Sequence, residues 1–355
     1  MGAPRSARAG RRYRRARRLD RNARGVAAVV GTLLALLVFF ALFGIFLTEY
    51  LPVWMSSNES QFTAQSIASL ATFKSNIDSQ YALGGPPLYS TQFPLSSQGV
   101  PLLAQPTEAT LTLLPPSCAN SFYTSNGTPE SVSACVFERQ AFSAGAAAKT
   151  NVPWNATTVT ALLEMQLPNR YFSQQTFYYE DDAIVQSQGG GHAAIIGPPP
   201  LTITKTGANV SLTSSYVELY GNSTVVIGQG SEEVYSQLIT DQTVTSLSRF
   251  LTSTGTTVPF NYTFQVGTRN PCAWFYYFTN LTAASGLSKY TSGTGPGWTL
   301  SWAATGSTSY TTAPTSTACL NIPAATYLVT LKVINLTYAT VTLSALIVSL
   351  GAGVA

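Results

Sequence analysis

The chain has 355 residues and a formal net charge of +4, from 19 Lys and Arg and 15 Asp and Glu, with one His and four Cys. This length accommodates a membrane segment and one or two globular domains. A single histidine excludes multi-histidine metal sites, and the chain contains neither a G-x-S-x-G elbow nor a phosphate-binding P-loop. These features favour a non-enzymatic protein without a cofactor.

The first 47 residues combine dense positive charge with an apolar run. Ten arginines lie in the first 24 residues, so residues 25–355 carry a net charge of −5. The uncharged segment Val26 to Leu47 would form a helix roughly 33 Å long, enough to cross a bilayer. The positive-inside rule explains the arginines better than a nucleic-acid-binding arm does. We therefore expect a basic cytoplasmic tail or leader (1–25), a single-pass transmembrane helix (26–47) and an extracellular C-terminal part.

The next segment, residues 48–83, is expected to form a membrane-proximal helical stalk. Tyr50 and Trp54 suit the membrane interface, and Pro52 predicts a kink or interruption of the helix. From Gln61 to Tyr81 the pattern is that of an amphipathic helix, with Lys74 and Asp78 placed to pair on its exposed face. The apolar stripe of this helix consists of Phe62, Leu70, Phe73, Ile77 and Tyr81.

Residues 84–355 are expected to form a β-rich antiparallel head, which makes the fold class α+β, with a possible subdivision near 198–200. Short β-type runs alternate there with Pro, Gly and Ser clusters, as in a β-sandwich. Ser231 to Phe250 is expected to be helical, and Gly286 to Thr317 a long surface loop. Ala339 to Ala355 has a period of two that favours a strand over a second membrane element. The expected strands are Thr110–Leu114, Ser131–Arg139, two within Thr176–Gln188, Ala193–Ile196, Leu201–Thr206, Asn209–Leu219, Thr224–Ile227 and those within Tyr327–Leu350.

Cysteines and glycosylation motifs fit an exterior location. None of the cysteines shows the tight spacing of a zinc or redox site, so two disulfides are expected in an oxidising exterior. Neighbours in sequence close the smaller loops, which favours Cys118 with Cys135 and Cys272 with Cys319 among three possible connectivities. Eight Asn-x-Ser/Thr sequons lie after the apolar run, consistent with a glycoprotein: Asn58, Asn126, Asn155, Asn209, Asn222, Asn261, Asn280 and Asn335.

Several polar residues were weighed as sites of chemistry. The triplet Glu180-Asp181-Asp182 suits a hard cation such as calcium, but its spacing lacks the alternation of an EF-hand and fits a turn between two strands better. His192 follows three glycines and is expected on a loop, not as a general base. Glu232 and Glu233 are expected to be solvated charges at a helix N-terminus.

Two further sets of residues bear on binding or catalysis. The aromatic run Trp274, Phe275, Tyr276, Tyr277 and Phe278 suits a carbohydrate site, although a strand packed around a disulfide explains it better. A hydrolase would need carboxylates from distant positions in one cleft, such as Glu164, Asp181 and Asp241.

The junction between the basic segment and the apolar run carries a family resemblance. The sequence from Arg24 to Thr32, RGVAAVVGT, followed by two leucines, resembles the N-terminus of archaeal type IV pilin-like proteins. Val30 stands where bacterial pilins have Glu, and Ala27-Ala28 where many archaeal members have Ser-Pro. The resemblance implies an archaeal source, leader cleavage between Gly25 and Val26, and a helix able to pack in a filament core under a β-rich head.

Three functions follow as expectations. The first is a non-enzymatic, membrane-anchored cell-surface protein with a structural or adhesive role. The second is a subunit of a pilus-like filament after leader cleavage. The third is an extracellular enzyme or glycan-binding protein. The expected partners are the lipid bilayer and, for the filament, other pilin-like subunits or cell-envelope components; no nucleic acid is expected.

Overall fold

The computed structural model describes residues 29–83, 88–100, 103–115, 137–144, 154–189, 192–248, 250–251, 257–290, 295–304 and 327–350. The chain divides into two compact units, Met1–Ser57 and Asn58–Ala355. We call the second unit the head.

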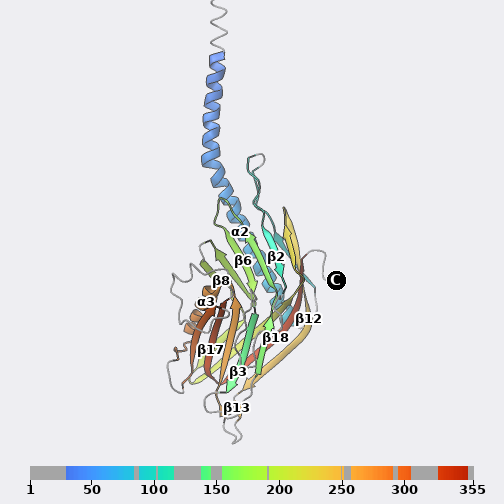
Figure 1. Ribbon diagram of the computed structural model, residues 1–355, viewed down its shortest axis with the longest axis vertical. Coiled ribbons are helices and arrows are strands. Elements are labelled where there is room, and N and C mark those ends of the chain that lie inside the picture. The colour runs from blue at the N-terminus through green and yellow to red at the C-terminus, as the bar shows by residue number, and fades with distance from the viewer. Residues whose placement is uncertain are drawn as a thin grey trace, which may run out of the picture. The chain divides into compact units, whose positions relative to one another are not determined.

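The described part of the first unit is helical throughout. Residues 29–45 are α-helical, a π-helical turn η1 follows at Phe46–Tyr50, and α2 covers Leu51–Leu83, of which residues 58–83 are part of the head (Figure 1). The backbone N–H of Leu51 bonds to the carbonyl of Phe46, five residues earlier. Pro52 has no N–H to donate to the preceding turn. The π-helical turn, which is wider than an α-helical turn, lies just before Pro52, and the helix continues past both. Of the two expected outcomes at Pro52, the interruption is therefore wrong, and the kink stays a prediction.

Three sheets account for most of the described residues of the head (Figure 1). The first sheet has the order β1 (Tyr89–Pro94), β12 (Ser231–Ser248), β18 (Tyr338–Leu350), β10 (Asn209–Tyr220) and β9 (Leu201–Thr206). The second has the order β11 (Thr224–Ile227), β2 (Thr110–Leu114), β5 (Leu162–Leu167), β6 (Gln175–Glu180), β7 (Ala183–Gln188) and β8 (His192–Gly197). The third has the order β16 (Gly297–Ala304), β17 (Tyr327–Leu336), β15 (Phe260–Thr268), β3 (Phe137–Ala144) and β4 (Trp154–Val159).

The remaining described elements are a two-stranded pair, β13 (Phe250–Leu251) with β14 (Thr257–Val258), and helix α3 (Pro271–Ala284). Each of the described strand pairings is antiparallel except that of β10 with β18. The expected α+β class with an antiparallel β-rich region is confirmed at this level.

β18 lies at the centre of the first sheet. It pairs along Ser211–Tyr220 with β10 on one side and with β12 on the other. Val341 and Val348 are fully buried. Residues 338–350 are thus a core strand, as the period of two predicted, and not a second membrane element.

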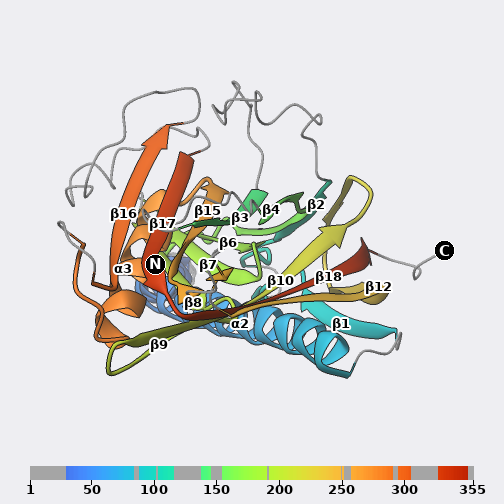
Figure 2. The ribbon, with the colours of Figure 1, turned by 90° about the horizontal axis from the view of Figure 1, so that it is seen from below.

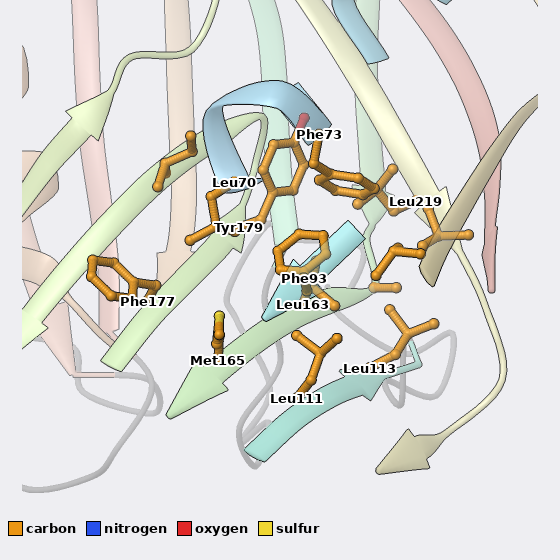
Figure 3. Packing of buried hydrophobic residues seen from close by; sticks show 14 of the residues in the cluster. Leu70, Phe73, Phe93, Leu111, Leu113, Leu163, Met165, Phe177, Tyr179 and Leu219 are labelled. Carbon is orange, nitrogen blue, oxygen red and sulfur yellow. The ribbon is translucent and has the colours of Figure 1, made fainter. Parts of the chain in front are cut away.

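The described residues of the head form two hydrophobic clusters, and the first sheet contributes to both. In the first cluster, α2 and one end of the first sheet pack on the second sheet (Figure 3). In the second, the other end of the first sheet packs with the third sheet and α3. β10 and β18 run from one cluster to the other: Leu219 and Val348 lie in the first, Leu212 and Val341 in the second. These two long strands join the two halves of the head.

The head portion of α2 is an integral part of the first cluster. The predicted stripe is confirmed for Phe62, Leu70, Phe73 and Ile77, which are buried, while the Tyr81 side chain lies outside the described set. The Phe73 ring lies edge-on to Phe93 and Tyr179, at centroid separations of 6.0 and 5.2 Å (Figure 3). Side-chain hydrogen bonds also join α2 to β1 and β12, which lie beside it in Figure 2.

Two predicted elements have the wrong type of secondary structure: a predicted helix is a strand, and a predicted strand is a helix. Ser231 to Phe250 was expected to be a helix but forms β12 and the start of β13, so Glu232 and Glu233 lie on a strand. Trp274 to Phe278 was expected to be a strand but lies in α3, with Pro271 at the first helical turn, where its missing N–H costs nothing. Part of the expected loop Gly286–Thr317 is also ordered, as edge strand β16.

We predict that Phe73→Ala destabilises the full chain in detergent by about 3–5 kcal/mol, because it removes a ring from the middle of the first cluster. Denaturant unfolding followed by circular dichroism measures the change. Ser75→Ala, on the exposed face of the same helix, is the matched control and should alter stability by less than about 0.5 kcal/mol. Equal effects of the two substitutions would contradict the packing described here.

Candidate functional site

The most distinctive surface of the described chain is the apolar helix of the first unit. One helix, Val29–Gln80, is long and apolar enough to cross a membrane, and none of its most apolar stretch is buried within the protein. Its exposed fractions include 60% for Leu33, 64% for Leu37 and 59% for Phe39. Tyr50 and Trp54, expected at the membrane interface, are also exposed. Length and composition alone make this segment a candidate membrane span.

The expected acidic turn is present, but its side chains are buried. Glu180 pairs with Ala183 at the end of the β6–β7 hairpin, and Asp181 and Asp182 are the two central residues of the turn. Both have positive φ, 47° and 60°, which fits the two-residue turn with left-handed backbone that matches strand twist. Glu180, Asp181 and Asp182 are only 0–2% exposed.

Glu180 attaches this turn to the second hydrophobic cluster. Its Oε1 accepts hydrogen bonds from Thr268 Oγ1, at 2.6 Å, and from Trp274 Nε1, at 2.9 Å. These donors come from the end of β15 and from α3. Burial raises the pKa of Glu180, although the two donors and the charge of Arg269 oppose the shift. Trp274, considered for a carbohydrate site, is instead fully buried and holds this carboxylate.

Asp182 attaches the same turn to α2. Lys74 Nζ lies 3.2 Å from Asp182 Oδ1 and donates to the Asp182 carbonyl at 2.9 Å. The expected pair of Lys74 with Asp78 is also present, at 3.3 Å, so one ammonium group serves two carboxylates. Tyr179 donates to Asp182 as well. Burial raises the pKa of Asp182 to about 6, although Lys74 opposes the shift.

Asp181 differs from its neighbours because neither of its carboxylate oxygens has a hydrogen-bond partner. Burial, followed by the charges of Glu180 and Asp182, raises the pKa of Asp181 well above its usual range. An ionised carboxylate in such surroundings is costly unless it is paired. The turn thus connects α2, β15 and α3 through Glu180 and Asp182, and leaves Asp181 between them.

Another buried carboxylate, that of Glu59 on α2, was missed by the sequence analysis. Its two oxygens accept the backbone N–H groups of Arg170, Tyr171 and Phe172, at 3.0, 2.7 and 2.7 Å, and the hydroxyl of Thr107. Three consecutive N–H groups turned to one carboxylate form an anion-binding nest. Glu59 thereby fixes the loop between β5 and β6 to the helix. Glu59 lies five residues after Trp54 and just before the predicted amphipathic stretch, and no local sequence pattern marks its role.

The remaining candidate residues lie on different strands or outside the described side chains. Glu164 on β5 pairs with Arg269 at 3.6 Å, and His192 is exposed at the start of β8. The Asp241 side chain lies outside the described set. Among the described residues, no three His, Cys, Asp or Glu side chains are grouped to hold a metal ion.

Cysteines and sequons are only partly covered by the structure. Cys272 is disulfide-bonded and no described cysteine is free, but Cys118, Cys135 and Cys319 lie outside the described residues, so the pairing stays a prediction. Asn126 and the Asn155 side chain also lie outside. The described sequon asparagines fall into two groups: exposed Asn209, Asn222 and Asn280, and partly buried Asn58, Asn261 and Asn335.

Comparisons with protein-family models, curated protein sequences and solved structures found no match for this chain.

We predict that Glu59→Gln destabilises the full chain by about 2–4 kcal/mol, because it replaces charge-assisted acceptors by an amide whose NH2 group faces backbone donors. Denaturant unfolding in detergent measures the loss. Glu108→Gln, the same change at an exposed position, should cost less than about 0.5 kcal/mol. A stability loss equally small for Glu59→Gln would show that the nest contributes little.

Proposed function

We propose that this chain is a non-enzymatic, single-pass membrane protein of the cell surface, with a structural or adhesive role, a cytoplasmic N-terminus and an extracellular head. The observation that carries the proposal is a contrast along one helical stretch. Residues 29–45 are uncharged and their large apolar side chains are exposed, whereas the stripe from Phe62 to Ile77 is buried in the head.

The exposed stretch supports a lipid environment. Water-soluble proteins rarely expose contiguous apolar surface, because each exposed apolar group lowers the gain from folding. A bilayer removes this cost, and a helix satisfies its backbone hydrogen bonds internally, as the hydrocarbon core requires. Exposed apolar side chains in this stretch are Val29, Val30, Leu33, Leu34, Leu36, Leu37, Val38, Phe39, Phe40, Leu42, Phe43 and Ile45.

The head portion of α2 supports a durable attachment between anchor and head. Its buried stripe, Glu59 and Lys74 hold it to the sheets by apolar packing, a backbone nest and an ion pair. The head cannot release this helix without exposing its first hydrophobic cluster. Such an element suits a protein that must keep a surface domain attached to its anchor.

The orientation rests on the sequence. The arginine-rich segment before residue 26 favours the cytoplasm under the positive-inside rule. Among the described sequon asparagines of the head, the exposed Asn209, Asn222 and Asn280 are the best acceptors for glycans. In Asn58 and Asn335 the amide nitrogen already donates to a backbone carbonyl, of Gln98 and Gly295 respectively, so these two sequons are poorer acceptors.

A filament subunit with a pilin-like N-terminus is the second candidate. Its specific support is that the apolar helix is free of charge from residue 29 to 48. The same surface that suits lipid also suits the packing of helices from other copies, once cleavage between Gly25 and Val26 releases the basic leader.

Membrane integration is tested by alkaline carbonate extraction. We predict that the wild-type chain stays in the membrane pellet and needs detergent for release. A double variant, Leu36→Arg and Leu37→Arg, should lose membrane integration, because each central arginine costs about 3 kcal/mol on insertion. The control Leu36→Ile and Leu37→Ile should behave like wild type. Extraction of the wild type by carbonate alone would overturn the proposal that the apolar helix anchors the chain in the membrane.

The two candidates differ at the mature N-terminus. A static anchor predicts that mass spectrometry finds the arginine-rich segment still attached, with the chain in the membrane fraction. A mature chain that begins at Val26 and is recovered in sheared filaments would replace the anchor by the filament subunit.

A further inference from the structure

We propose that the Glu180–Asp182 turn is a buried proton-binding site, in which Asp181 keeps its carboxyl proton at neutral pH and the head gains stability as the medium becomes acidic. This inference concerns the head alone and does not depend on the proposed membrane location.

The first argument is the number of carboxylate oxygens that lack a partner. The three side chains are within 2% of complete burial. Four of their six oxygens accept no hydrogen bond: Glu180 Oε2, Asp181 Oδ1, Asp181 Oδ2 and Asp182 Oδ2. A buried acceptor without a partner is costly, and an ionised one far more so. Glu59 shows the alternative in the same head, since its carboxylate receives four hydrogen bonds.

The second argument is the balance of charged groups around the turn. α2 contributes Lys74 and Asp78, β5 contributes Glu164, and Arg269 follows β15. β6 adds Tyr178 and Tyr179, which are neutral in their usual state, and α3 carries no charged residue. Two cations therefore face five carboxyl groups, and Lys74 and Arg269 are shared with Asp78 and Glu164. Asp181 contacts neither cation, so no positive charge offsets the cost of ionising its buried carboxyl group. Of the three acids in the turn, Asp181 is therefore the one most strongly favoured to stay protonated.

The backbone of the turn also prevents the three carboxyl groups from rotating out to solvent. Asp181 and Asp182 occupy left-handed backbone positions that the two-residue hairpin requires. Hydrogen bonds from Thr268 and Trp274 hold Glu180, and Lys74 holds Asp182. The side chain between these fixed neighbours stays inside the head. No described group of three acidic, His or Cys side chains is arranged to place a metal ion there.

The direction of the pH dependence follows from the carboxyl groups with raised pKa. The folded head keeps the Asp182 proton up to a pKa of about 6, whereas the unfolded chain loses it near 3.8. The folded state then binds more protons, so stability falls as pH rises through this window and the loss is complete above it. Burial raises the pKa of Asp181 and of Glu180 as well, and both act in the same direction.

Asp181→Asn tests the site without disturbing the turn, because Asn has the same shape and accepts the left-handed backbone. The full chain is unfolded by heat in detergent at pH 7.5 and at pH 4. We expect the variant to melt roughly 5 °C above wild type at pH 7.5, and within about 2 °C of it at pH 4. The exposed control Glu108→Gln should shift neither value. A variant that melts below wild type at both pH values would overturn the proposal.

A second readout does not require the variant to fold. Infrared spectroscopy of the wild-type chain at pH 7.5 should show the carbonyl stretch of a protonated carboxyl group, which disappears on unfolding. Absence of this band would overturn the proposal. So would a rise in melting temperature on adding calcium chloride at pH 7.5, because the turn would then be a cation site instead.

Discussion

The structure depends on one constraint: a single stretch of helix must suit two different surroundings. From residue 29 to 45 its side chains are apolar on all sides except for Thr32, and from Glu59 onward one face is buried in a head that also supplies polar partners. A helix meets the first requirement because its backbone needs no external hydrogen bonds. It meets the second through side chains placed three and four residues apart on the face that packs on the sheets.

The head contains few charged residues, and three of its buried acidic side chains have three different kinds of surroundings. The Glu59 carboxylate accepts hydrogen bonds from backbone N–H groups, and Asp182 forms an ion pair with Lys74. Asp181 receives neither, which leaves a bound proton as its means of avoiding a bare buried charge. The first two arrangements attach α2 to loops of the second sheet. The acidic turn also reaches Thr268 and Trp274, so it lies where the two hydrophobic clusters meet.

Much of the fold was predictable from local pattern. Thr110–Leu114 and Thr224–Ile227 were predicted to the residue because short runs of Thr, Leu, Val and Ile are followed directly by Pro115 and Gly228. A helix was predicted where β12 lies and a strand where α3 lies, and these errors have a different cause. Residues four apart share a face both in a helix and in a strand, so Val234 with Leu238 and Trp274 with Phe278 fit either structure. Tertiary partners decided between them, and single-sequence patterns do not contain that information.

The candidate site was predictable only in part. The turn at Asp181 and Asp182 follows from local chemistry, but its burial depends on Lys74, Thr268 and Trp274, which lie up to 108 residues away. The nest around Glu59 likewise joins positions 111 to 113 residues apart. Charge triplets and single acids in a sequence carry no sign of such partners, which is why an ordinary turn between two strands was the natural expectation.

The central claim is that the apolar helix crosses a membrane with the head outside, and accessibility of epitope tags on intact cells tests it most directly. One tag is placed after Met1 and one after Ala355. The account predicts that an antibody reaches the C-terminal tag on intact cells and reaches the N-terminal tag only after permeabilisation. Labelling of the N-terminal tag alone on intact cells would contradict it.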